Sequence, residues 1–137
     1  MTRGAAGDGR RRGSTDRRVG AHGRKPKPLV AVVMGSESDL PEMRPCLATL
    51  RKLGIPHTRH VLSVHRDPSA TARFAETAAS SGLRVIIAGA GLAAHLAGAI
   101  ASRTSLPVIG VPLARGPLAG VDAFVSTLQM PSGVPVA

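Results

Sequence analysis

The sequence predicts an α/β fold in which helices cover both faces of a parallel sheet, giving a three-layer α/β/α sandwich. Residues 29–34 are six apolar residues without polar alternation, as in a strand buried on both faces. A small, hydroxyl-rich loop at residues 35–39 follows this run and leads into helical spacing. The order of strand, loop and helix then recurs along the chain. Such repeats place a ligand at the carboxyl ends of the strands.

Composition limits the class of protein. The 137 residues allow one domain, and the apolar fraction of 43% suffices for a core. Phe74 and Phe124 are the only Phe, Tyr or Trp residues, so the core must be mainly aliphatic. A single cysteine, Cys46, excludes an internal disulfide. Because no signal-peptide pattern and no apolar run of about 18 residues is present, we expect a cytoplasmic protein.

The positive charge is concentrated near the N-terminus. Residues 1–28 carry nine of the 18 Lys and Arg residues and two acidic residues, a net charge of +7, whereas residues 29–137 carry +3. The first segment is rich in Gly and Arg and poor in large apolar side chains, which predicts a disordered basic tail. It is either a weak tether for RNA or phosphate or a solvated extension. Because it has no Phe, Tyr or Trp side chain for base stacking, the sequence favours the extension.

The first helix should begin just after the hydroxyl-rich loop. Asp39 is a candidate N-cap, and Pro41 falls in the first turn, where a missing N–H is tolerated. Apolar residues recur at helical spacing until Gly54, which can end the helix. Pro45 does not suit a helix interior, so we expect a kink or a late helix start there.

Three further strand and helix units follow. The predicted strands are 58–62, 85–88 and 106–112, and the predicted helices are 68–80, the small-residue segment up to about 104, and 121–129. Residues 134–137 resemble the opening of a fifth strand. Right-handed crossovers then give the strand order 2-1-3-4, with an incomplete fifth strand at the edge.

The loop after the first strand carries candidate binding residues. A helix N-terminus there offers backbone N–H groups and two hydroxyls, which suit phosphate. Its two carboxylates would repel an anion placed directly on them and therefore suit sugar hydroxyls better. Helix capping is an alternative explanation for Ser38 and Asp39. The loop consists of Gly35, Ser36, Glu37, Ser38 and Asp39.

The loop after the second strand contains Ser63, His65 and Arg66. Arg66 can bind a phosphate with two parallel hydrogen bonds, and Ser63 can add a hydroxyl donor. His65 is the one obvious titratable acid or base candidate in a predicted strand-end loop. The alternative is a surface His–Arg pair in an edge loop.

The loop after the third strand begins with Gly89, Ala90 and Gly91, which permit close approach of the backbone to a flat ligand. A dinucleotide-binding fingerprint does not fit, because no acidic residue follows about 20 positions later. His95, placed about four residues into the third helix, is expected to pack or to brace this loop. No spacing of His, Cys, Asp and Glu indicates a metal site.

Five motifs resemble, in order and spacing, those of the 5-(carboxyamino)imidazole ribonucleotide mutase family of purine biosynthesis. They are Val-Met-Gly-Ser-Glu-Ser-Asp (33–39), Ser-Val-His-Arg (63–66), Ala-Gly-Ala-Gly-Leu-Ala-Ala-His-Leu-Ala-Gly (88–98), Pro-Val-Ile-Gly-Val-Pro (107–112) and Gln-Met-Pro-Ser-Gly-Val-Pro-Val (129–136). The resemblance covers residues 29–137 and implies a flavodoxin-like subunit of a homo-octamer. It implies an isomerase that converts N-carboxyaminoimidazole ribonucleotide into its C4-carboxylated isomer without cofactor or metal.

The resemblance also implies roles for individual residues. Ser36 and Asp39 would hold the ribose-phosphate end of the substrate, Arg66 with Ser63 would bind the phosphate, and His65 would transfer the proton. The backbone of the third loop would lie along the base, supported by the histidine that follows it.

Two alternatives to the mutase remain open. One is a related carboxylase that uses free CO₂ and aminoimidazole ribonucleotide, with the same residues in the same roles. The other is a non-catalytic module that binds a sugar phosphate. The family continues beyond Gly-Val-Pro-Val with a further strand segment and helices, so residues 29–137 are expected to lack these C-terminal elements.

Overall fold

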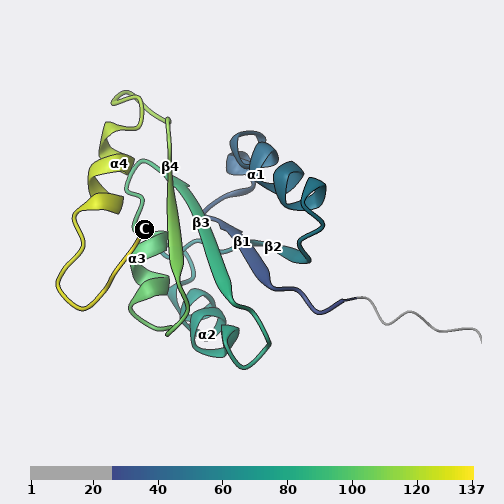
Figure 1. Cartoon of the computed structure of the whole chain (residues 1–137). Helices are drawn as coiled ribbons and strands as arrows, with labels where there is room; N and C mark the ends of the chain where they lie inside the picture. Colours follow the sequence, from purple (N-terminus) through teal and green to yellow (C-terminus); the bar gives the residue numbers. More distant parts are fainter. Residues whose placement is uncertain (1–25) are drawn as a thin grey trace, which may run out of the picture.

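The computed structural model describes residues 26–137, and its strands and helices alternate along the chain (Figure 1). Most of the predicted tail, residues 1–28, lies outside this range. All strands are parallel and follow the order β2-β1-β3-β4, so the predicted fold class and strand order are confirmed. No helix within the described range is long and apolar enough to cross a membrane. The elements are β1 (Val30–Met34), the 3-10 turn η1 (Glu37–Asp39), α1 (Leu40–Lys52), β2 (His57–Val61), α2 (Pro68–Ala78), β3 (Val85–Gly91), α3 (Leu96–Ala101), β4 (Val108–Leu113) and α4 (Val121–Leu128).

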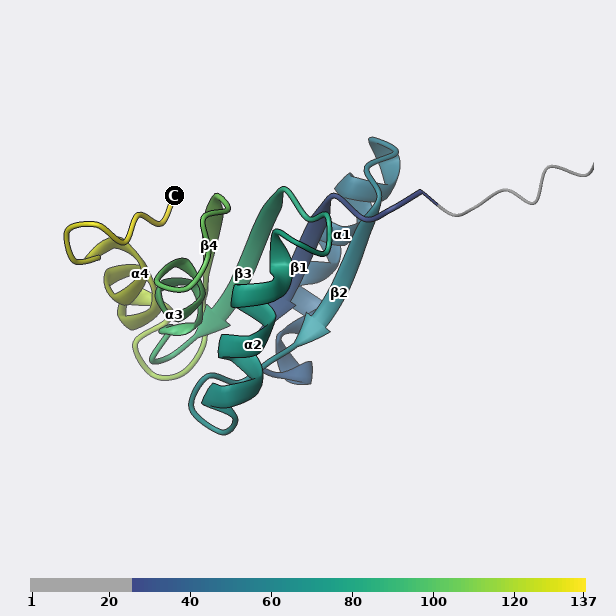
Figure 2. The same cartoon turned by 90° about the horizontal axis from the view of Figure 1, so that it is seen from below.

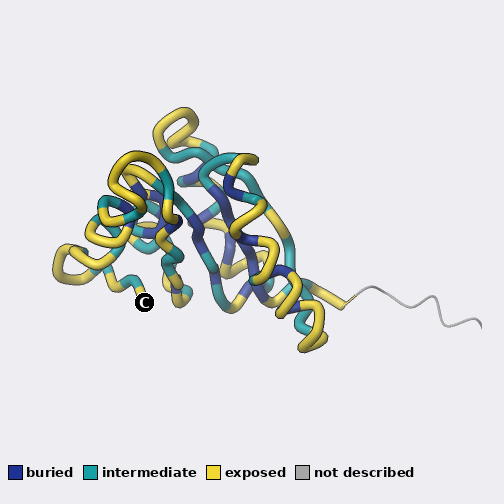
Figure 3. Tube along the Cα trace, turned by 90° about the horizontal axis from the view of Figure 1, so that it is seen from above, coloured by how far each residue is buried: buried dark blue, intermediate teal, exposed yellow. Residues whose placement is uncertain are grey.

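Helices cover both faces of the sheet (Figures 1 and 2). On one face, Met43 of α1 packs into a core with Val32 and Met34. On the other face, α2 and α3 form a core with Ala31 and Val33, and α4 lies beside β4. All five residues of β1 are buried, and Figure 3 shows this buried stretch in the middle of the molecule. The absence of polar alternation in β1 therefore follows from its position between two helical layers.

The parallel register brings the carboxyl ends of the strands to one edge of the sheet. Met34, the last residue of β1, pairs with the last residue of β2 and with Gly89 of β3. β3 and β4 end in register at Gly91 and Leu113. The N–H of Gly35 donates a hydrogen bond of 3.2 Å to the Gly89 carbonyl oxygen. The loops that leave these strands consequently open on the same edge.

Helix α1 begins at Leu40, directly after the candidate N-cap Asp39, as predicted. It runs continuously over Leu40–Lys52 with Pro45 inside it, so the late start, one of the two effects expected from Pro45, does not occur. Pro45 is exposed in the second turn, where its ring removes a single backbone hydrogen bond close to the N-terminus of the helix. Burial of Met43 and Leu47 on either side of the proline outweighs this loss. Gly54 follows the helix with a φ of +67°, as expected for a glycine that ends a helix.

The end of β3 and the start of α3 differ from the prediction. β3 extends to Gly91, because β4 continues beside it and supplies partners as far as Leu113. The predicted loop of small residues is therefore the end of a strand. Leu92, with a φ of +57°, turns the chain away from the sheet. The helix α3 begins only at Leu96, so His95 lies at its N-terminal boundary and not one turn inside it.

The last residues follow the free edge of β4. The Ala137 N–H donates to the Val108 carbonyl oxygen at 3.0 Å, and the Ala137 carbonyl oxygen accepts from the Gly110 N–H at 2.8 Å. Residues 134–137 form no regular strand, so the predicted fifth strand is present only as this pairing.

Candidate active site

A cleft of about 530 Å³ lies at the carboxyl edge of the sheet. Its walls come from the ends of all three predicted site loops and from the loop after β4, residues 114–120. The predicted site residues other than Gly89 and His95 all line it. They are Gly35, Ser36, Ser38, Asp39, Ser63, His65, Arg66, Ala90 and Gly91.

The first loop is held together by its own polar groups. The Ser36 N–H donates to Oδ2 of Asp39 at 2.9 Å, and the Ser38 N–H donates to Oγ of Ser36 at 3.3 Å. These two bonds form a capping box around η1, so capping and a binding role coincide in the same residues. Because both N–H groups are used within the loop, they are not free to bind a phosphate.

The second loop is tied to the first by arginine. Nη2 of Arg66 donates to the Gly35 carbonyl oxygen at 3.3 Å, and the Arg66 N–H donates to Oγ of Ser63 at 3.4 Å. The Arg66 side chain remains exposed, with further N–H groups available at the cleft. It is therefore the cationic group of this loop that suits a phosphate.

Two histidines meet at the edge of the cleft. Nε2 of His65 and Nδ1 of His95 are 2.9 Å apart, and the rings are arranged edge to face with centroids 5.0 Å apart. One of these nitrogens must donate the hydrogen and the other must accept it. His95 also lines a second, separate cavity beside α4. His95 therefore contacts His65 of the second loop, and its predicted role in bracing the loop after β3 stays a prediction.

Gly89 contributes to the site indirectly. Its missing side chain faces α1, because an added Cβ would lie 2.5 Å from Sδ of Met43. Ala90 and Gly91, the next two residues of β3, line the cleft instead. Gly89 thus allows close packing between β3 and α1, and the contact of its backbone with a ligand stays a prediction.

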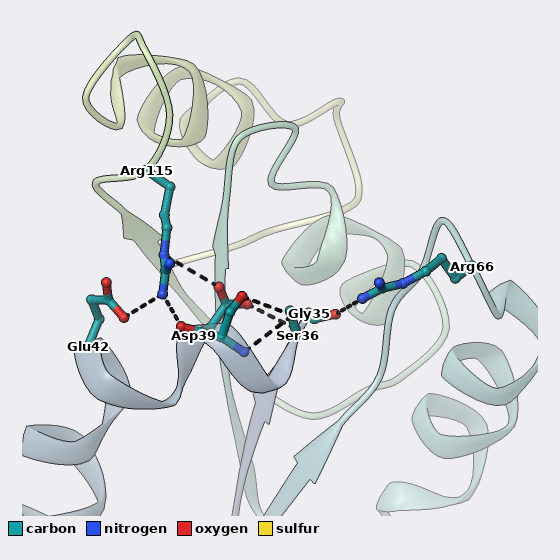
Figure 4. A network of polar contacts seen from close by, with 7 residues as sticks. Gly35, Ser36, Asp39, Glu42, Arg66 and Arg115 are labelled. Carbon is teal, nitrogen blue, oxygen red and sulfur yellow. Dashed lines mark hydrogen bonds and ion pairs between the residues drawn. The ribbon is translucent and has the colours of Figure 1, made fainter.

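Arg115 is a cleft residue that no sequence motif singled out. It follows the end of β4, and its guanidinium lies against the first loop on the side opposite to Arg66 (Figure 4). Its Nη2 donates to Oε2 of Glu42 at 2.7 Å and to the Ser38 carbonyl oxygen. Its Nε lies 3.8 Å from Oδ1 of Asp39. The sequence could have pointed to Arg115 by its position directly after the fourth predicted strand. Ligands of parallel sheets bind at the carboxyl ends of the strands, and this applies to the fourth loop as it does to the other three.

The charge of Asp39 depends on competing influences. Its side chain is buried, and desolvation is the strongest influence, raising the pKa of the carboxyl above its ordinary value of 3.8. The hydrogen bond from the Ser36 backbone and the positive charge of Arg115 lower this pKa. Glu42 raises it and Arg66 lowers it to a smaller extent. The protein thus compensates in part for placing a carboxylate in a buried position.

The fold and cleft define a class: a flavodoxin-like α/β protein whose candidate ligand site lies where the parallel strands end, with an imidazole beside a cationic anchor. Within residues 26–137, no group of three or more His, Cys, Asp or Glu side chains is placed to hold a metal ion. Residues 29–137 match the family described as AIR carboxylase. The chain belongs to the AIR carboxylase family, which confirms the resemblance of the five motifs.

Individual relatives agree with this assignment. A protein of Synechocystis sp. named N5-carboxyaminoimidazole ribonucleotide mutase is 50% identical over 112 residues, which cover 82% of this chain and 64% of that protein. A Schizosaccharomyces pombe protein named phosphoribosylaminoimidazole carboxylase is 52% identical over 110 residues, 80% of this chain and 20% of its own length. The crystal structure of Treponema denticola PurE2-S38D has a TM-score of 0.74 at 26% identity, covering 82% of this chain and 70% of that one. The chain thus spans less than two thirds of the Synechocystis relative.

Proposed function

We propose that this chain carries the catalytic core of an N5-carboxyaminoimidazole ribonucleotide mutase, an isomerase of purine biosynthesis. The observation that carries the proposal is the pairing of His65 with His95 beside a cleft that also holds Arg66 and Asp39. A substrate with a phosphate, a ribose and a reacting base needs three groups in one place. A cation binds the phosphate, an acceptor binds the ribose hydroxyls, and an acid/base group transfers the proton. The names of the relatives support the same reaction.

The proposed substrate lies along the edge of the sheet. Arg66 and Ser63 bind the phosphate, because the exposed guanidinium offers N–H donors there. Ser36 and Asp39 bind the ribose hydroxyls, since a carboxylate accepts hydrogen bonds but repels phosphate. The base lies along the backbone of Ala90 and Gly91, which line the cleft. This arrangement directs the reacting atoms toward His65.

The proposed chemistry moves one carboxyl group and one proton within the substrate. The bond between the substrate nitrogen and its carboxylate breaks, CO₂ leaves, and the nitrogen retains the electron pair and takes a proton from protonated His65. The C4 carbon then attacks the CO₂, and His65 takes the C4 proton, which restores its starting state. His95 holds the imidazole in position through the 2.9 Å contact. Retention of CO₂ beside C4 keeps the second step effectively intramolecular.

Replacement of His65 tests this mechanism. In His65→Asn, the conversion rate should fall by about 10²- to 10⁴-fold, the usual contribution of a general acid or base. The measurement is formation of the C4-carboxylated product by the full-length chain at saturating substrate. His60→Asn is the matched control, because His60 lies on β2, packs against Phe74 of α2 and does not line the cleft. Equal rates for wild type and His65→Asn would favour a non-catalytic sugar-phosphate-binding module.

A carboxylase is the second candidate function, because the S. pombe relative carries that name. It would combine free CO₂ with aminoimidazole ribonucleotide at the same residues. The two reactions are separated by supplying N-carboxyaminoimidazole ribonucleotide in one assay and aminoimidazole ribonucleotide with CO₂ in another. Product formation at comparable rates from the second mixture would contradict the mutase proposal.

The proposal extends to assembly and location. We propose a homo-octamer, as the family resemblance implies, and we propose that it acts in the cytoplasm. The apolar side chains exposed along α4, among them Phe124 (55% exposed) and Leu128 (66% exposed), support an oligomer, because packing against another subunit would remove them from water.

A further inference from the structure

We propose that Arg115 is a positioning residue for Asp39, which it holds in the charged, oriented state that a ribose hydroxyl requires. This inference rests on the proposed function for the role of Asp39, but its structural basis is independent of it. Arg115 comes from the loop after β4, whereas Asp39 belongs to η1, and both residues line the same cleft. One side chain therefore joins two walls of the site (Figure 4).

The position of Arg115 is determined by several contacts. Its Nη2 binds Oε2 of Glu42 at 2.7 Å and the Ser38 carbonyl oxygen. These two acceptors belong to α1 and η1, so the guanidinium is attached to both elements that carry the first loop. The Arg115 side chain is 31% exposed, which is low for a cleft arginine and agrees with this enclosed position.

The stem of Arg115 is also enclosed. A Cβ added at Gly91 would lie 2.7 Å from Cγ and 2.8 Å from Cβ of Arg115, so the stem crosses the end of β3 where a side chain is absent. The next residue, Gly116, has a φ of +69° and lies against Leu92. The loop of residues 114–120 is thereby held against the end of β3, and the guanidinium is directed toward Asp39.

The two oxygens of Asp39 have different surroundings. Oδ2 accepts the hydrogen bond from the Ser36 N–H, whereas Oδ1 lies 3.8 Å from Nε of Arg115. Within the described residues, this Nε is a buried donor without a hydrogen-bond partner. A buried donor of this kind favours a negative charge on the neighbouring oxygen.

The effect of Arg115 on ionisation has a defined sign. Burial raises the pKa of Asp39, and Arg115 is the strongest opposing charge, followed by Arg66, while Glu42 acts in the same direction as burial. Loss of the Arg115 charge should therefore raise the pKa of Asp39 further. A protonated Asp39 is a weaker acceptor for a ribose hydroxyl, so substrate binding should weaken as the pH falls.

The test uses Arg115→Met, which keeps an apolar stem and removes the charge, and Arg115→Lys, which restores a charge. The first readout is an NMR titration of the Asp39 carboxyl in the full-length chain without substrate. In Arg115→Met, the midpoint should move to higher pH, and in Arg115→Lys it should return toward wild type. Arg103→Met is the matched control, because Arg103 forms a surface ion pair with Glu76 at 2.9 Å outside the cleft.

The second readout is kinetic. In Arg115→Met, KM should rise by about tenfold with a smaller change in kcat, and the acid limb of the kcat/KM profile should move to higher pH. A purely structural role would lower kcat/KM equally at every pH. An unchanged Asp39 titration and acid limb in a folded Arg115→Met variant would overturn the inference. Absence of turnover in wild type would instead contradict the proposed function, while the substrate-free titration would still test Arg115.

Discussion

At the residue scale, Asp39 combines a binding role with an unfavourable position for a charge. It is 6% exposed, and its carboxyl has a raised pKa because burial outweighs the Ser36 hydrogen bond and the Arg115 charge. A folded-state pKa above the unfolded value means that the folded protein binds the proton more tightly. The stability associated with protonated Asp39 is therefore present at low pH and is lost as the pH rises through the folded-state pKa.

The Asp39→Asn substitution should reveal this unfavourable charge. Asparagine can still accept the hydrogen bond from the Ser36 N–H, but it carries no charge to bury. We expect the variant to be more stable than wild type at pH 7, with the difference decreasing toward and below pH 3.8, the ordinary pKa of the group. The measurement is the free energy of unfolding in urea as a function of pH.

Glu76→Gln serves as the control for removal of an exposed carboxylate, because Glu76 lies on the surface of α2 outside the cleft. A stability difference for Asp39→Asn that grows as the pH is lowered would contradict a raised folded-state pKa. The same variant should lose substrate affinity, because the proposed ribose contact depends on the carboxylate. Stability and binding would then change in opposite directions at one residue.

At the scale of elements, Gly89 determines how closely α1 approaches the sheet. Met43 of α1 is 1% exposed and occupies the space that a Cβ at position 89 would need. The contact lies directly beneath the first loop, since the Gly89 carbonyl oxygen accepts a hydrogen bond from the Gly35 N–H. Packing between β3 and α1 is thus coupled to the placement of the cleft wall.

Gly89→Ala should destabilise the protein through this contact. The added Cβ would lie 2.5 Å from Sδ of Met43, and overpacking of this kind costs about 1–3 kcal/mol. Thermal unfolding of the variant, followed by circular dichroism, measures the loss as a lower Tm. Met43→Ala makes room for the new methyl group, so the double variant should lose less stability than the two single changes added together. Strict additivity would show that the two side chains do not compete for space.

At the scale of the whole molecule, the apolar surface is unevenly distributed. The core lies on both faces of the sheet, but α4 and the loop before it expose several large apolar side chains. An exposed apolar group of this kind marks an interaction surface in many proteins. These side chains are Leu118, Val121, Phe124, Val125 and Leu128, all between 43% and 66% exposed.

A charge placed on α4 should disrupt the proposed octamer. Phe124→Asp would put a carboxylate into the apolar surface, where burial against another subunit would leave it unpaired. Light scattering after size-exclusion chromatography should then give a smaller mass than for wild type. Leu53→Asp is the matched control, because Leu53 is 64% exposed at the far end of α1. An unchanged mass for Phe124→Asp would exclude α4 from the subunit contact.

Local signals in the sequence were sufficient for most of the fold. The unbroken apolar run of β1, the proline at the start of α2 and the glycine after α1 each act within a few residues, and each feature is present where it was predicted. The limits of β3 and α3 were predicted less well. β3 is longer because β4 pairs with it as far as Leu113, and each pairing partner is 22 residues away in sequence.

The sequence by itself determined the fold class, the strand order, the family and most residues that line the cleft, because these follow from local spacing and from motifs at strand ends. Only the tertiary structure decided how the side chains meet. Nε2 of His65 lies beside a nitrogen of His95 30 residues away, and Arg115 reaches Glu42 across 73 residues. Such contacts depend on the register of the sheet and on the missing side chain at Gly91, and no local pattern encodes both.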